Sequence, residues 1–177
     1  MSTLKQLLIF AACISVLGCA TTAGTEAHTS VAAFDNAKIV EISEHGAQCA
    51  SSDPCIGIGG QWSSSHQDYA YIRIKTFSFL SYYGITEATL RIDGVDFHLR
   101  SPERMTAMSK LSNMLYESSQ SFRVPLDLFR RIERAKDVRI RVNTTNGYVD
   151  DVIISGKADS KAYHAIRRFL KAIDTAK

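Results

Sequence analysis

Two turn dipeptides, each placed between short alternating segments, constrain the fold of this chain more than any other feature of its sequence. They are Asp93-Gly94, between residues 86–92 and 95–99, and Asn146-Gly147, between residues 138–142 and 148–154. Asp-Gly and Asn-Gly are favoured in two-residue hairpin loops because such loops need positive φ angles at their central positions. The sequence therefore predicts two antiparallel hairpins.

Other segments show the period of a strand. In residues 69–77, Ala70, Ile72 and Ile74 alternate with Tyr71, Arg73 and Lys75, which predicts a strand with one solvent-exposed face. Shorter extended segments are predicted at residues 38–43, 56–62 and 121–124.

Helical spacing of apolar residues predicts helices at residues 102–116, at residues 125–136, and from Asp159 or Ser160 towards the end of the chain. The first of these depends on Met105, Met108, Leu111 and Leu115, which recur at helical intervals. Strands joined by turns, together with these helices, predict an α+β fold: a mostly antiparallel sheet with two or three helices packed on one face.

The N-terminal segment has the composition of an export signal. Lys5 precedes an apolar run from Leu7 to Leu17, which is too short to span a hydrocarbon core of about 30 Å. The run ends in Val16-Leu17-Gly18-Cys19 and resembles the lipobox of bacterial lipoprotein precursors. The resemblance implies cleavage before Cys19, acylation of Cys19, and, because Ala20 follows, an outer-membrane location facing the periplasm. The alternative is an ordinary secretory signal in which Cys19 is incidental.

Three segments are therefore expected. Residues 1–18 are the signal peptide, and residues 19–36, which are small and polar, are a flexible tether. Residues 37–177 are a single domain, because the 159 residues left after cleavage suffice for one core and not for two. The order of hairpins and helices is similar to that of uncharacterised periplasmic domains in bacterial lipoproteins, a resemblance that implies no activity.

Two cysteines remain in the predicted domain. Cys49 and Cys55 are six positions apart, and an even pair in an exported protein predicts a disulfide. The alternative is a metal site made by these cysteines with His45 and His66, although their spacing fits no compact Cys/His pattern. We expect the disulfide and no metal.

The charge of the chain is unevenly distributed. Residues 19–99 have a net charge of −5, and residues 100–177 have a net charge of +7. A basic half favours anionic partners, or it forms the solvated faces of helices. The candidate anion-binding residues are Arg139 and Arg141, on one face of one predicted strand, with Arg130 and Arg134.

Chemical motifs are sparse. Gly57, Gly59 and Gly60 do not form G-x-G-x-x-G, and no G-x-S-x-G nucleophile motif occurs, so we expect no cofactor. His98 beside Asp96 and Arg100 is a candidate acid–base cluster.

Tyr82 and Tyr83 are the candidate partner-binding residues, because they belong to the most aromatic run of the predicted domain. We therefore expect a non-catalytic binding or assembly module of the envelope. Its partner is expected to be an envelope protein, a glycan or an anionic lipid, and not a nucleic acid. The alternative is a small hydrolase acting on cell-wall or lipid material, using His98, Asp96 and a serine.

Overall fold

The computed structural model describes residues 24–49, 55–79, 81–102, 105–156 and 158–177. Its strands are β1 (His28–Val31), β2 (Lys38–Gly46), β3 (Ile56–Ser63), β4 (Tyr69–Ser78), β5 (Ile85–Ile92), β6 (Val95–Leu99), β7 (Ala107–Lys110), β8 (Tyr116–Pro125), β9 (Asp137–Thr144), β10 (Gly147–Ser155) and β11 (Ala158–Asp159). Its helices are α1 (Leu126–Arg134) and α2 (Lys161–Ala176).

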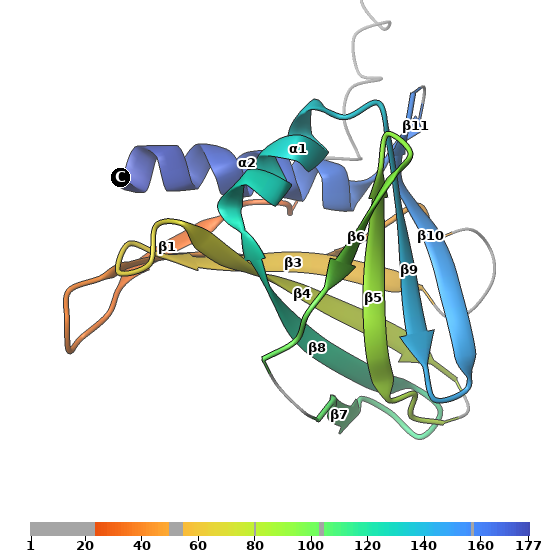
Figure 1. The fold of residues 1–177 in the computed structure, drawn as a ribbon. Helices are drawn as coiled ribbons and strands as arrows, with labels where there is room; N and C mark the ends of the chain where they lie inside the picture. The colour runs from red at the N-terminus through yellow and green to blue at the C-terminus, as the bar shows by residue number, and fades with distance from the viewer. Residues whose placement is uncertain (1–23, 50–54, 80, 103–104, 157) are drawn as a thin grey trace, which may run out of the picture.

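The strands form two antiparallel sheets that cross steeply and curl around one interior (Figure 1). Sheet A has the order β1-β2-β3-β4-β8-β7, and sheet B has the order β11-β10-β9-β5-β6. Two backbone contacts join their edges: Arg123 N donates to Arg100 O at 3.3 Å, and Gln48 N donates to Val152 O at 2.9 Å. The two sheets therefore behave as one curled wall that is partly closed at both edges.

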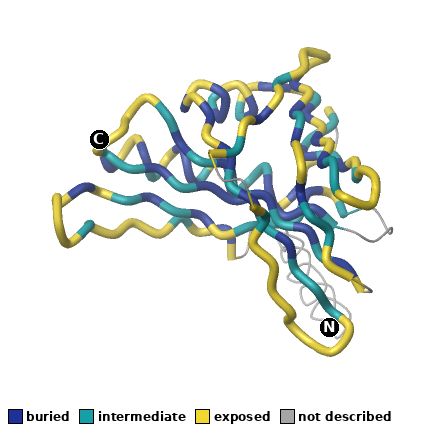
Figure 2. The backbone as a smooth tube through the Cα atoms, turned by 60° about the horizontal axis from the view of Figure 1, so that its bottom comes forward, coloured by how far each residue is buried: buried dark blue, intermediate teal, exposed yellow. Residues whose placement is uncertain are grey.

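Alternation along the strands produces the core. Ala70, Ile72 and Ile74 of β4 are fully buried, whereas the residues between them are only half-buried. Figure 2 shows that buried residues gather in the interior of the molecule, while the turns that project from it are exposed. Leu90 and Ile140 face inward from sheet B. These side chains belong to a single buried cluster that also contains the apolar faces of both helices. The alternation in residues 69–77 is thus confirmed.

The helices close one end of the curled wall (Figure 1). α2 packs on β2 and β3 and contacts α1, and its residues Phe169, Leu170 and Ile173 are fully buried. The ring centroid of Phe169 lies 5.1 Å from that of Phe129 in α1. The predictions of helices at 125–136 and after Ser160 are therefore correct in place.

The glycines of β3 allow this packing. A Cβ atom at Gly60 would lie 3.1 Å from the ring of Phe169 and 3.3 Å from that of Phe129, closer than ordinary van der Waals contact. Gly60 is thus a point where a strand backbone meets two helical rings, which is a packing reason for the glycine-rich sequence of β3.

Both predicted hairpins form. β5 and β6 pair with Ile92 opposite Val95, and Asp93 and Gly94 have φ angles of 46° and 87°. β9 and β10 pair with Thr144 opposite Gly147. The Asp93-Gly94 dipeptide thus occupies the two loop positions of its hairpin and predicts its register. In the second hairpin the loop residues are Thr145 and Asn146, and Tyr148 pairs with Asn143, whereas an Asn146-Gly147 loop would pair Tyr148 with Thr145.

The predicted fold class is wrong. The protein is mostly β, with a curled antiparallel wall and two helices in its described residues, rather than α+β with one sheet and helices on one face. The helix expected at residues 102–116 is absent from the part of this segment that the structure describes, where β7 pairs with β8 instead. The helical spacing of the methionines was misleading because pairing with a distant strand satisfies the backbone of residues 107–110.

The N-terminal segment also differs from expectation. β1 pairs with β2 along its whole length, Thr25 is fully buried, and Glu26 forms an ion pair with Arg168 of α2. Residues 24–31 are therefore held on the domain, although their composition predicted a tether over 19–36. No helix in the described part of the chain is long and apolar enough to cross a membrane.

Candidate functional site

The outer face of sheet B bears charged side chains around a hollow of about 410 Å³. We call it the charged face, and define it by the outward residues Arg91, Asp96, His98, Arg139, Arg141 and Asp150. The hairpin registers place Arg91 opposite Asp96 and Arg141 opposite Asp150. The face is thus built by the two hairpins that the turn dipeptides specify.

Two of its arginines are held by carboxylates. Arg91 Nε donates to Asp96 Oδ1 at 2.6 Å, and Arg91 Nη2 donates to Asp96 Oδ2 at 2.8 Å. Arg141 donates to both oxygens of Asp150, at 2.7 and 2.6 Å. These hydrogen bonds lower the pKa of Asp96 and of Asp150 below their usual range. Both carboxylates therefore stay ionised and offset the arginine charges.

Arg139 lies directly opposite Arg91 in the pairing of β5 with β9. Like charges at such positions repel, and Arg139 is turned to Asp137, with 3.2 Å between Arg139 Nε and Asp137 Oδ2. The predicted anion-binding pair, Arg139 and Arg141, is thus engaged by aspartates. With Asp137 counted, the three arginines of the charged face meet three aspartates, so little positive charge is left to favour an anion.

The candidate acid–base cluster is dispersed. His98 Nδ1 lies 3.1 Å from Thr89 Oγ1, and the carboxylate of Asp96 is bound to Arg91. In the described residues the histidine contact is thus with a threonine, on an exposed sheet surface. This arrangement lacks the serine–histidine–aspartate contacts that a hydrolase of the expected kind needs.

The cysteine pair is a disulfide, as predicted, with a Cα–Cα distance of 5.0 Å. Asp151 lies beside it: Cys49 N donates to Asp151 Oδ2 at 3.3 Å, and Val152 N donates to Asp151 Oδ1 at 2.8 Å. Burial raises the pKa of Asp151 above its usual range. His66, a ligand only in the alternative metal site, stacks on Tyr69. The disulfide therefore has a structural role between β2, β3 and β10.

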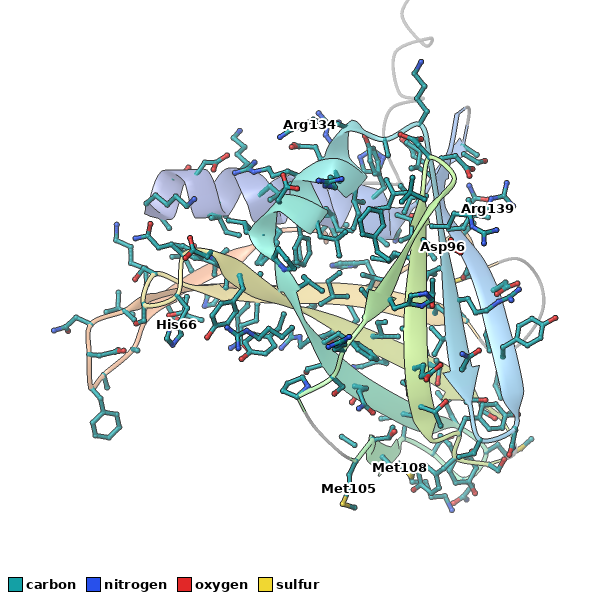
Figure 3. All side chains as sticks on the ribbon, in the orientation of Figure 1. His66, Asp96, Met105, Met108, Arg134 and Arg139 are labelled. Atoms are coloured by element: carbon teal, nitrogen blue, oxygen red, sulfur yellow. A yellow bond between two sulfur atoms is a disulfide. The ribbon has the colours of Figure 1, made fainter. Side chains whose placement is uncertain are left out.

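The end of the molecule opposite the helices is apolar and exposed. We call it the methionine end, and its exposed large apolar residues are Phe79, Tyr82, Met105, Met108, Leu111 and Met114. Met105 and Met114 are 81% and 65% exposed. Figure 3 shows Met105 and Met108 projecting from β7 and the segment before it, away from the core.

The two candidate tyrosines lie at this end with different roles. Tyr82 is exposed and makes an edge contact with Tyr116, with 4.8 Å between ring centroids. Tyr83 is half-buried, and its backbone N–H donates to Ser118 Oγ at 3.3 Å. Sequence reasoning found the tyrosines but missed the methionines as a surface, because it had read the spacing of Met105 and Met108 as that of a helix. Their neighbours Ser109, Ser112 and Asn113 were the available signal against that helix.

Arg130 and Arg134 belong to a third surface, on the helices. Arg130 forms ion pairs with Asp174 and, at 3.8 Å, with Glu133. Figure 3 shows Arg134 on the helical end, well separated from Arg139 on sheet B. The four arginines predicted as anion-binding candidates therefore do not form one site. A hollow of about 480 Å³ lies between the helices, beside Arg130, Arg167 and Lys171.

No protein-family model, curated protein or solved structure matches this chain.

Proposed function

We propose that this protein is an outer-membrane lipoprotein, anchored through Cys19 and facing the periplasm, whose domain binds another envelope protein through the methionine end without catalysis of its own. The observation that carries this proposal is the methionine end itself: six large apolar side chains that are all exposed. They belong to segments that converge on Tyr116, which pairs with Ser78 and Lys110 and contacts Tyr82.

The clustering of these side chains is what favours binding. Single exposed apolar residues are ordinary on protein surfaces, whereas contiguous apolar patches mark interaction sites. Methionine is unbranched and polarisable, so it adapts to the shape of an apolar partner. The expected partner presents an apolar segment, which Met105, Met108 and Met114 would cover.

The position of the surface suits an anchored protein. Residues 24–27 lie against α2, whereas β7 lies at the opposite end of the molecule (Figure 1). Cys19 is outside the described residues, and its anchoring role is supported by the lipobox resemblance. The Cys49–Cys55 disulfide supports export, because such bonds persist in oxidising compartments. An anchor at Cys19 would leave the methionine end directed away from the membrane.

The binding proposal is tested by crosslinking in cells. A photoreactive residue replaces Met108, and a matched one replaces Phe34, which is fully exposed in the turn between β1 and β2. We expect a discrete protein adduct from position 108 that is absent from position 34. Met105→Glu with Met114→Glu should abolish the adduct while the circular dichroism spectrum is retained. Identical adducts from both positions, or none from position 108, would contradict the proposal.

The anchor is tested separately. Cys19→Ala should prevent incorporation of labelled fatty acid and processing before residue 19. Incorporation into the variant, or a wild-type protein without acyl chains, would favour the ordinary secretory signal instead.

A further inference from the structure

We propose that the exposed side of the two helices lies against the anionic lipid headgroups of the membrane that holds the protein. We call this surface the basic helical face and define it by Arg134 of α1 with Arg167, Arg168 and Lys171 of α2. The inference rests on the anchor proposed at Cys19.

The first observation is the length of chain between the anchor and the domain. Gly24 is five residues after Cys19, and an extended chain of that length spans at most about 18 Å. The chain then runs directly onto α2: Thr25 is buried, Glu26 pairs with Arg168, and Ala27 packs against the core. An anchor at Cys19 therefore holds Gly24 within about 18 Å of the membrane surface. The part of α2 that residues 25–27 contact is held close to the membrane with it.

The second observation is the charge of the helical end. Residues 126–134 and 161–177 contain eight lysines and arginines and three aspartates and glutamates. Residues 19–177 have a net charge of +2, so the remainder of the mature chain is net negative. A bilayer surface rich in anionic lipids attracts the positive end and repels the rest. The orientation set by the short connection is thus the one that electrostatics favours.

The third observation is how the cations are displayed. Arg167, Arg168 and Lys171 lie within about one turn of α2, on the side away from the buried Phe169 and Leu170. Arg168 is engaged by Glu26, whereas the nearest aromatic partner of Arg167 is Tyr163, at 6.0 Å. Arg167 and Lys171 line the hollow of about 480 Å³ between the helices. The two acids in its lining, Glu133 and Asp174, are paired with Arg130, so Arg167 and Lys171 are the cations it offers to a headgroup phosphate.

The native lysines permit a test without added probes. The full-length mature protein is reconstituted in vesicles of phosphatidylcholine alone or with phosphatidylglycerol, and its lysines are modified with an amine-reactive reagent. We expect Lys171 to react several-fold more slowly in vesicles that contain phosphatidylglycerol. Lys110 of β7, at the opposite end, should react equally in both. The protection should disappear at about 1 M salt, where the screening length falls to about 3 Å.

Charge reversals complete the test. Arg167→Glu should remove the protection of Lys171, whereas Arg139→Glu on the charged face should leave it unchanged. A Lys171 rate that is equal in both vesicles, in protein that remains anchored, overturns the inference and leaves the anchor intact.

A chain that mass spectrometry finds without acyl groups refutes the anchor alone. The inference then depends on co-sedimentation with phosphatidylglycerol vesicles. The inference is supported if the protein binds these vesicles and Arg167→Glu lowers the binding at least about fivefold, the factor expected for one cation at such a surface. The absence of binding overturns the inference.

Discussion

Asp151 is a buried carboxylate that links the disulfide loop to β10, and its protonation makes the stability of the fold pH-dependent. Burial raises the folded-state pKa above the unfolded value of 3.8. The stability that comes from the protonated form is therefore fully present below about pH 4 and is lost as the pH rises through the folded pKa. Asp151→Asn stays neutral and should remove this dependence.

The measurement is urea unfolding of both proteins at a series of pH values. The stability of wild type relative to Asp151→Asn should fall as the pH rises from about 4 towards neutrality. Exposed acids such as Asp96 and Asp150, whose pKa values are lowered, give the opposite slope and contribute equally to both proteins. A difference independent of pH would mean that the environment of Asp151 does not disfavour its charge.

Gly60 is the second residue with a testable effect on stability, because the fold requires that it has no side chain. Gly60→Ala places a methyl group against the rings of Phe129 and Phe169, and overpacking of this kind costs about 1–3 kcal/mol. Thermal unfolding should show the loss. In the Phe169→Leu background, which shortens the ring, the same change should cost less. An equal cost in both backgrounds would place the strain in the strand rather than against the helix.

At the scale of the elements, what the sequence could predict depended on how local the determining interactions are. The hairpins were predictable because Asp93-Gly94 and Asn146-Gly147 are typical of turns between short strands, although only Asp93-Gly94 occupies both loop positions and so predicts its register. The register of the first hairpin places Asp96 opposite Arg91, so this pair of the charged face could also have been derived. An Asn146-Gly147 loop would have placed Asp150 opposite Asn143, whereas the structure places it opposite Arg141.

β7 and β1 were not predictable in this way, because each is ordered by pairing with a strand that its own sequence does not specify. Met105 and Met108 have a spacing typical of a helix, but β7 gains its hydrogen bonds from β8. The methionine end was missed for the same reason: whether an apolar side chain is buried depends on the element that carries it.

Ser160 determines where α2 begins. Its Oγ accepts from Tyr163 N at 3.2 Å and donates to Ile153 O at 2.7 Å, so it caps the helix and satisfies a carbonyl of β10. Ser160→Ala should lower the free energy of unfolding by about 1–2 kcal/mol. Asp159→Ala is the matched control, because Asp159 was the other candidate cap and is exposed. Its Oδ2 lies 2.9 Å from His164 Nε2, and because this carboxylate is exposed, the variant should cost less than about 1 kcal/mol. Equal losses in chemical denaturation would contradict the assignment of Ser160 as the cap.

At the scale of the molecule, one buried cluster underlies the charged face, the methionine end and the basic helical face. It contains inward residues of sheet A, of sheet B and of both helices. The two chain halves of opposite charge are thus interleaved in one core, since β8 pairs with β4 and β9 pairs with β5. Exposed ion pairs between them add little once salt screens them, so burial rather than charge should hold the halves together.

Phe169 tests this unity because it is fully buried in α2, a helix that packs on β2 and β3 of sheet A and contacts β10 of sheet B. Phe169→Ala should cost about 3–5 kcal/mol, since it leaves a cavity that the surrounding strands cannot fill. In a single cooperative core this loss also reaches elements distant in sequence, so hydrogen exchange should show lower protection at residues 69–99 as well as at 125–177. Protection lost only at residues 125–177 would instead indicate two independent units.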